Sequence, residues 1–323
     1  MQVGNDWRDA GDEAHVYSMA LSPSGKTIAA GTSDGTVRLW DVERRRAIAK
    51  STEHTLIVWT ICWSGDGERV VSGSPDRTAR VWDARGGKLV LNQLINAGHE
   101  VHAVIYSPDM LTIATGGYNE YENAIQIWDS KTGEQLTTVK HNDTIFSLAW
   151  ASKQRKLIVG SGDGLIKIFD TTTWKQVATL EGHQDTVYNI TLSLDDRLLA
   201  SASWDQTARL WNLDTNHAIG PPLQHEDAVN AATASADGKL LVTACEDDNV
   251  QVWDIHTILK DAGAEKLLSI PDVSVRISLQ YFTDNVQSSH REMDSNRWYD
   301  MSNDYSVEIT LIFTHRSKLQ SRS

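Results

Sequence analysis

Histidine is the residue type that could carry out chemistry in this chain, because 11 copies are present and neutral imidazole binds metals or accepts protons. Six histidines recur ahead of alternating apolar runs, at His15, His54, His99, His141, His183 and His225. The other five have neither a His-Glu-x-x-His spacing nor a paired-cysteine partner, and they are His102, His217, His256, His290 and His315. No serine stands out as a nucleophile, because the one Gly-x-Ser-x-Gly spacing, Gly31-Thr32-Ser33-Asp34-Gly35, falls at a tight turn between two predicted strands rather than between a strand and a helix. We therefore expect structural or solvated histidines, no metal site and no catalytic residue.

One short motif, Gly25-Lys26-Thr27, has the ending of a phosphate-binding loop. Such a loop needs a glycine five residues before its Gly-Lys pair, and this chain has Ala20 there. The loop also needs a helix after it, whereas the residues that follow read as a strand. The sequence therefore predicts no nucleotide site and no other cofactor.

The composition narrows the class of protein. The chain has 323 residues, of which 30 are Lys or Arg and 43 are Asp or Glu, so its net charge is −13. An acidic surface repels phosphate groups, which argues against binding to nucleic acid or to an anionic membrane. The two cysteines, Cys62 and Cys245, cannot build a disulfide framework, and no signal peptide or membrane-length apolar stretch is evident. We expect an intracellular protein, cytoplasmic or nuclear, that is monomeric on its own.

The elements that position the histidines repeat along the chain. A Trp-Asp pair or a near variant recurs every 41 to 46 residues, at Trp40-Asp41, Trp82-Asp83, Trp128-Asp129, Phe169-Asp170, Trp211-Asn212 and Trp253-Asp254. Within each unit, runs with a period of two are separated by turns rich in Gly, Asp, Ser and Pro. This pattern predicts an all-β chain of antiparallel meanders.

These units resemble the WD-repeat family over about 240 of the 323 residues, and they are similar to arrays in fungal intracellular WD-repeat proteins. The resemblance implies a β-propeller with six recognisable blades. It also implies hydrogen-bonded tetrads, with full sets at His54/Ser72/Asp76/Trp82, His183/Ser201/Asp205/Trp211 and His225/Thr243/Asp247/Trp253. The other units depart from the set, with Ala30 in the first, an insertion over 116–124 in the third and Phe169 in the fourth. We expect blades one, three and four to be less rigid.

The ends of the propeller are predicted separately. Residues 1–254 are assigned to the propeller, 255–269 to a short helix and 270–323 to a weakly ordered tail. The outer strand of the sixth blade would come from the N-terminus, around Gln2 to Trp7. Two alternating stretches, 273–282 and 305–313, could instead supply part of a degenerate seventh blade. Six and seven blades therefore both remain open at this stage.

A propeller offers a channel mouth for recognition, and the repeat places one residue of each inner strand there. These six residues follow the first aliphatic of each strand and are Tyr17, Trp59, His102, Phe146, Tyr188 and Asn230. They serve either for packing between blades or as anchors for a partner, and Trp204 and Tyr118 in nearby loops could extend the surface. We expect a non-catalytic scaffold for a protein or peptide partner whose identity the sequence does not name.

An alternative function rests on a single residue. Trp82-Asp83-Ala84-Arg85 resembles the box by which some WD-repeat proteins dock on the adaptor of cullin-RING ubiquitin ligases. The repeat itself supplies almost every other position, so Arg85 is the one independent signal, and Ala79 stands where the box has an aliphatic residue. A solvated surface arginine explains Arg85 equally simply.

Overall fold

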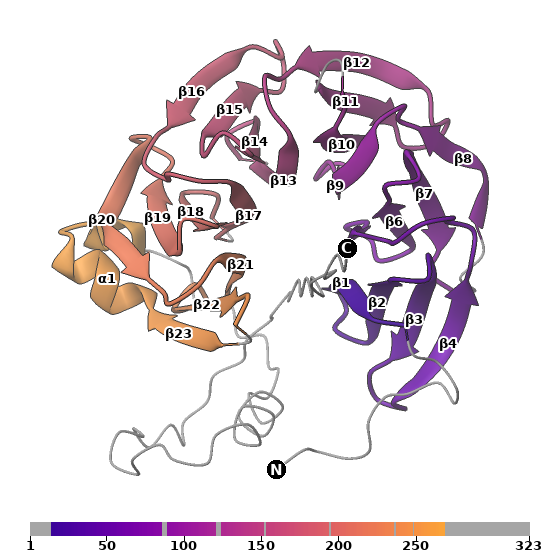
Figure 1. Ribbon diagram of the computed structural model, residues 1–323, viewed down its shortest axis with the longest axis horizontal. Coiled ribbons are helices and arrows are strands. Elements are labelled where there is room, and N and C mark those ends of the chain that lie inside the picture. The colour runs from indigo at the N-terminus through magenta and orange to yellow at the C-terminus, as the bar shows by residue number, and fades with distance from the viewer. Residues whose placement is uncertain are drawn as a thin grey trace, which may run out of the picture.

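The computed structural model describes residues 14–85, 89–120, 124–151, 153–193, 195–235, 237–247 and 249–268. They form six antiparallel sheets arranged as blades around a common axis, as Figure 1 shows. The fold prediction, an all-β propeller with six blades and a short C-terminal helix, is confirmed. Gln2 to Trp7 and the stretches 273–282 and 305–313 lie outside the described residues.

The blades follow the repeats in order. Blade 1 has β1 (Val16–Leu21), β2 (Thr27–Thr32), β3 (Val37–Asp41) and β4 (Arg46–Ser51), and blade 2 has β5 (Thr60–Trp63), β6 (Arg69–Gly73), β7 (Thr78–Asp83) and β8 (Leu89–Asn96). Blade 3 has β9 (Glu100–Tyr106), β10 (Thr112–Tyr118), β11 (Ala124–Asp129) and β12 (Gln135–Lys140), and blade 4 has β13 (Ile145–Ala151), β14 (Lys156–Ser161), β15 (Ile166–Asp170) and β16 (Gln176–Leu180). Blade 5 has β17 (Val187–Leu192), β18 (Leu198–Ser203), β19 (Thr207–Asn212) and β20 (His217–Gln224), and blade 6 has β21 (Val229–Ala234), β22 (Leu240–Cys245) and β23 (Val250–Asp254).

The Trp-Asp pair ends the third strand of each blade and starts the turn that follows it. In blade 3, a carboxylate oxygen of Asp129 accepts hydrogen bonds from the backbone N–H groups of Lys131 and Thr132, both at 2.8 Å. Asp170 of blade 4 binds the backbone of its turn in the same way, at 3.0 and 2.7 Å. The aspartate therefore stops the strand by replacing ladder hydrogen bonds with local ones.

Neighbouring blades interlock through an aliphatic residue and a glycine. At or just before the start of four inner strands lies a completely buried aliphatic side chain, and these residues are Val58, Val101, Ile145 and Val187. Each lies against a glycine in the second strand of the preceding blade, at Gly31, Gly73, Gly116 and Gly160. A β-carbon on Gly116 would lie 2.5 Å from Cγ2 of Ile145, so only glycine leaves room for the neighbour.

Blade 1 and blade 6 are not interlocked by a buried aliphatic residue in this way. Val16, the residue of blade 1 that corresponds to these aliphatics, is 38 % exposed. Among the described strands, blade 6 has no fourth strand, and Val252 on its last strand is 55 % exposed. Figure 1 shows the described strands of blades 1 and 6 separated at this point.

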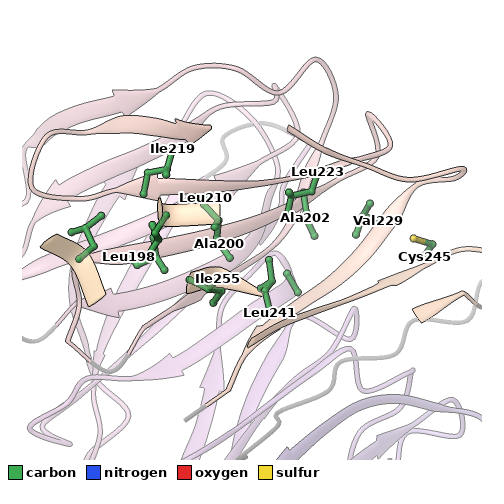
Figure 2. Packing of buried hydrophobic residues seen from close by; sticks show 14 residues of the cluster. Leu198, Ala200, Ala202, Leu210, Ile219, Leu223, Val229, Leu241, Cys245 and Ile255 are labelled. Atoms are coloured by element: carbon green, nitrogen blue, oxygen red, sulfur yellow. The ribbon is translucent and has the colours of Figure 1, made fainter. Parts of the chain in front are cut away.

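The helix predicted after the last Trp-Asp pair is present. α1 (Ile255–Asp261) is followed by the 3-10 turn η1 (Glu265–Leu268), and Asp254 caps α1 by accepting from the N–H groups of His256 and Thr257. The helix packs against β20 and β22, where Ile255 and Leu259 enter a cluster of buried side chains from blades 5 and 6. Figure 2 shows Ile255 close to Leu198, Leu210 and Leu241 in this cluster.

Candidate functional site

A β-bulge near the start of most inner strands directs one side chain toward the axis. In β1, Val16 opposes Thr32 and Ser18 opposes Gly31, so Tyr17 has no residue opposite it. The same irregularity leaves His102, Phe146, Tyr188 and Asn230 without an opposite residue in β9, β13, β17 and β21. A bulge re-aims the side chain it carries. This local feature gives the predicted residues their common position.

The six predicted residues line one cavity at the axis. Its volume is about 310 Å³, and its walls include Trp204 and Glu246 as well as all six ring positions, Tyr17, Trp59, His102, Phe146, Tyr188 and Asn230. Every one of the six is half-buried, so each side chain still reaches solvent. We call these six residues together with Trp204 the aromatic ring of the channel mouth.

Contacts within the aromatic ring run from blade 2 to blade 6. The rings of Trp59 and His102 meet edge to face with centroids 4.4 Å apart. Phe146 lies 5.3 Å from His102 and 5.5 Å from Tyr188. Tyr188 stacks on Trp204, whose indole Nε1 donates a hydrogen bond to Oδ1 of Asn230 at 3.1 Å. The arrangement is a continuous, largely aromatic wall.

A second set of side chains holds the inner strands beneath this wall. The buried hydroxyls of Ser18 and Ser147 accept hydrogen bonds from the backbone N–H groups of Ile61 and Ile190, each in the next blade and each at 3.1 Å. The Asn189 side-chain oxygen accepts from Ala232 in the same way, at 3.0 Å. Sequence reasoning missed these positioning residues. The signal was present, since a polar residue directly follows Tyr17, Phe146 and Tyr188.

Two of the three predicted tetrads have all their hydrogen bonds. His54 lies 2.7 Å from Asp76 and 2.8 Å from the Ser72 hydroxyl, to which Trp82 Nε1 also donates. His183, Ser201, Asp205 and Trp211 repeat these contacts in blade 5. Burial alone would raise the pKa of Asp76 and of Asp205, but hydrogen bonds from the histidine and a neighbouring threonine hold each pKa far below its usual value.

The third predicted tetrad lacks its aspartate, and this part of the prediction is wrong. His225 binds Thr243 at 2.7 Å, but its Nδ1 faces the carbonyl oxygen of Leu223 rather than Asp247. The side-chain amide of Asn249 donates to Oδ2 of Asp247. Asp76 presents the corresponding oxygen to its histidine and accepts from the Thr78 hydroxyl with the other one.

Blades 3 and 4 have an incomplete version of the network. Trp128 still donates to the Thr115 hydroxyl at 2.9 Å. Nε2 of His99 and Nε2 of His141 are buried without a hydrogen-bond partner, and in blade 4 Phe169 replaces the tryptophan whose N–H donates to the strand hydroxyl in the complete tetrads. Unsatisfied buried polar atoms weaken a fold, so a lower rigidity of these blades stays a prediction.

The remaining candidates lie elsewhere. Tyr118 is 44 % exposed at the end of β10 and does not line the cavity. Arg85 lies on the opposite face, where it pairs with Glu68 at 2.8 Å. The Gly25-Lys26-Thr27 segment forms a turn that leads into β2.

Metal and thiol chemistry find no support in the described part of the chain. No group of three His, Cys, Asp or Glu side chains there could hold a metal ion. Burial raises the pKa of the Cys62 thiol and raises that of Cys245 to about 12, so both stay protonated at neutral pH. No helix among the same residues is long and apolar enough to span a membrane.

The repeats match a known family. The model "WD domain, G-beta repeat" matches residues 10–41, 46–83, 133–170, 174–212 and 222–254. The chain belongs to the WD-repeat family. The matched residues do not include the third unit, which carries the insertion, although that unit forms a blade of four strands.

Individual WD-repeat relatives are distant. Protein FIZZY-RELATED 1 of Arabidopsis thaliana is 25 % identical over 169 residues, which are 51 % of this chain and 34 % of that protein. Anaphase-promoting complex subunit cdh1 of Dictyostelium discoideum is 24 % identical over 196 residues, 50 % of this chain and 26 % of its own length. The chain thus spans about a third or less of these two relatives. A chain in the crystal structure of a mitotic checkpoint complex shares the fold, with a TM-score of 0.69, 22 % identity and 77 % coverage of both chains.

Proposed function

We propose that this protein is a non-catalytic interaction scaffold that binds a protein or peptide partner through the aromatic ring of the channel mouth. The observation that carries this proposal is the cavity of about 310 Å³ lined by all six ring positions. Half-buried Tyr and Trp side chains offer apolar area together with a polar tip, which is the chemistry of binding hot spots. Side chains needed only for packing between blades would be buried, as Val101 and Val187 are.

The comparisons support the general class of function. One relative is named as a subunit of the anaphase-promoting complex, and the similar structure is that of a mitotic checkpoint complex. Both names describe assemblies of proteins. For this chain we propose a partner of the same broad kind, a protein or peptide, met inside the cell by a propeller that is monomeric on its own.

The test compares variants of the aromatic ring with a matched aromatic on the opposite face. The intact chain, the double variant Trp59→Ala/Tyr188→Ala and the control Trp174→Ala would each be used for affinity purification with mass spectrometry. Trp174 is a suitable control because it is half-buried, in the turn between β15 and β16. We expect the control to retain the partners of the intact chain and the double variant to lose them.

Stability measurements separate lost recognition from lost folding. Each ring truncation should cost less than the ~3–5 kcal/mol of a fully buried aromatic, because these side chains are already partly solvated. A larger loss in the free energy of unfolding would assign the ring to the core. Retained partners in a stable double variant would refute the proposed site.

The adaptor-docking function stays a prediction that depends on Arg85. Substitution Arg85→Ala should abolish co-purification with a cullin-RING adaptor if that function holds. A variant that still binds the adaptor would end it.

A further inference from the structure

The two faces of the propeller differ sharply in charge. The mouth face consists of the loops between second and third strands and the loops that lead into each inner strand, because antiparallel strands place these loops at one end. Acidic residues recur in these loops, at Asp34, Glu53, Asp76, Glu120, Asp143, Asp163, Glu181, Asp185, Asp205, Glu226, Asp227, Glu246 and Asp247. Among the described residues of the same loops, the one Lys or Arg is Arg77.

The turns of the opposite face are not acidic in this way. They carry lysines and arginines between the acids, for example Lys26, Arg45, Lys131, Arg155 and Lys239. In the described part of the chain, the loops of the mouth face therefore hold 13 acidic residues against one arginine. A charged rim of one sign attracts a partner of the opposite sign and raises its rate of association.

Some of the mouth-face acids are neutralised from within the blades. Arg38 lies 3.5 Å from Asp34, Arg80 lies 3.8 Å from Glu53, and Lys167 lies 2.8 Å from Asp163. Glu100, the first residue of β9, differs from these acids, because it lies 3.3 Å from His102 of the aromatic ring and makes no ion pair with a lysine or arginine among the described residues. The ion pairs with lysine and arginine lie in blades 1 to 4, so they do not neutralise the acidic residues beside blades 5 and 6.

The acids beside blades 5 and 6 have no such partner. Within the described chain, Asp185, Asp227 and Glu246 make no ion pair with a lysine or arginine, and Glu246 forms part of the cavity wall. Trp204 and Asn230 lie in the same sector of the wall. Aromatic faces and an unpaired carboxylate therefore meet at one side of the cavity.

We infer that the channel mouth binds a basic peptide segment by taking one of its cationic side chains, arginine or lysine, into the aromatic ring. Tyr and Trp faces attract a cation, and a cation that leaves water needs a nearby negative charge, which Glu246 and Glu100 supply. The cavity lies at the small end of the range for bound ligands, so it admits a side chain rather than a folded surface. An acidic segment would be repelled by the same rim. This inference rests on the proposed function.

The experiment begins without assuming the chemistry of the ligand. A phage-displayed library of random dodecapeptides would be selected on the intact chain, on Trp59→Ala/Tyr188→Ala and on the control Trp174→Ala. We expect peptides enriched in Arg or Lys on the intact chain and on the control, and their loss on the double variant. Two or three selected peptides would then be synthesised with a fluorescent label for affinity measurements.

Two matched changes isolate the charge. Replacing the critical arginine of a selected peptide by citrulline, or its lysine by acetyl-lysine, keeps the shape and should weaken binding by about tenfold. Glu246→Gln and Glu100→Gln should each weaken binding several-fold, and more at low salt than at high salt. Glu134→Gln, an exposed change on the opposite face, is the control and should leave the affinity unchanged.

The outcomes separate this inference from the proposed function. Acidic or uncharged peptides that bind the intact chain and are lost on the double variant would overturn the basic ligand while keeping the binding site. Citrulline and acetyl-lysine peptides that bind as tightly as the parents would also overturn it. Basic peptides that bind the double variant unchanged, or a selection that enriches nothing, would refute the aromatic ring as a binding site.

Discussion

Tyr188 stacks on Trp204 with ring centroids 5.4 Å apart and the ring planes inclined by 21°. The two residues come from different elements, since Tyr188 lies at the bulge of β17 and Trp204 in the turn after β18. Their contact ties the inner strand of blade 5 to the loop above it. The wall of the cavity is therefore ordered before any partner arrives, which lowers the entropic cost of binding.

The stack should appear as a modest coupling energy. In a double-mutant cycle of Tyr188→Ala and Trp204→Ala, we expect an interaction of about 0.5–1.5 kcal/mol, the range for aromatic pairs. Urea denaturation of the four proteins measures it. Additive effects of the two substitutions would show that the stack contributes nothing to stability.

The contact between Gly116 and Ile145 predicts a specific intolerance. Gly116→Ala should destabilise the protein by about 1–3 kcal/mol, because the new methyl group would overlap Cγ2 of Ile145. Gly65→Ala is the control, since the nearest atoms there are 3.7 Å away. Adding Ile145→Ala should cost less in the Gly116→Ala background than in the parent chain. Equal costs in both backgrounds would contradict the interlocking of the blades.

The completeness of the tetrads predicts unequal effects of two substitutions. Ser72→Ala removes the partner of both His54 and Trp82, so two buried groups lose a hydrogen bond and about 2–4 kcal/mol should be lost. His141→Leu should cost only about 1 kcal/mol, because Nε2 of His141 is already without a partner and only the contact of Nδ1 with the Asp143 carbonyl is lost. Chemical denaturation compares them. The reverse order would show that the network in blade 2 is not stabilising.

The buried histidines predict a loss of stability in mild acid. Burial lowers the pKa of His54, His99, His141 and His225 in the folded protein. As the pH falls below about 6.5, the unfolded chain therefore binds protons before the folded one, and each histidine can cost up to about 1.4 kcal/mol at pH 5.5. The loss ends for each histidine once the pH passes below its folded pKa.

A second loss should follow at lower pH. Because the pKa values of Asp76 and Asp205 are lowered in the folded protein, their ionised carboxylates stabilise the fold at any pH above the ordinary aspartate pKa. This contribution is lost progressively as the pH falls below about 4. Urea titrations at pH 7.5, 5.5 and 3.5 measure both stages, and His141→Leu should flatten the first. A free energy of unfolding that stays constant from pH 7.5 to 5.5 would contradict the first stage.

The edge of blade 6, which no described strand pairs with, predicts a role for the N-terminus. Deleting residues 1–9 should lower the melting temperature and promote aggregation, because β23 and its exposed Val252 would keep an open edge. Calorimetry and light scattering are the measurements, and a deletion of residues 315–323 is the matched control. An unchanged melting temperature after deletion of residues 1–9 would assign the closing strand to another segment.

Periodicity determined the repeat units of this protein. The Trp-Asp pairs and the alternating runs predicted six antiparallel meanders, because the hydrogen-bonding and burial rules of a meander are local and recur in each unit. The resemblance to WD repeats implied that these units form blades, and it left a seventh blade open. The same register located the six ring residues, since a repeat puts equivalent positions at equivalent heights. Tyr17 and Tyr188 lie 171 residues apart and still line one cavity.

Only the tertiary structure decided the finer chemistry. Nδ1 of His225 faces the carbonyl oxygen of Leu223 while Asp247 accepts from the Asn249 amide, and sequence spacing does not contain that geometry. The bulges that direct the ring residues inward are irregularities of strand pairing that the alternating pattern does not show. Glu246, Trp204 and Asn230 come from two neighbouring blades and line one cavity wall only because those blades pack together. The charge of a face likewise depends on the tertiary structure, because the antiparallel strand order decides which loops lie at one end of the molecule. Residues far apart in the chain add their electric fields only when they are close in space.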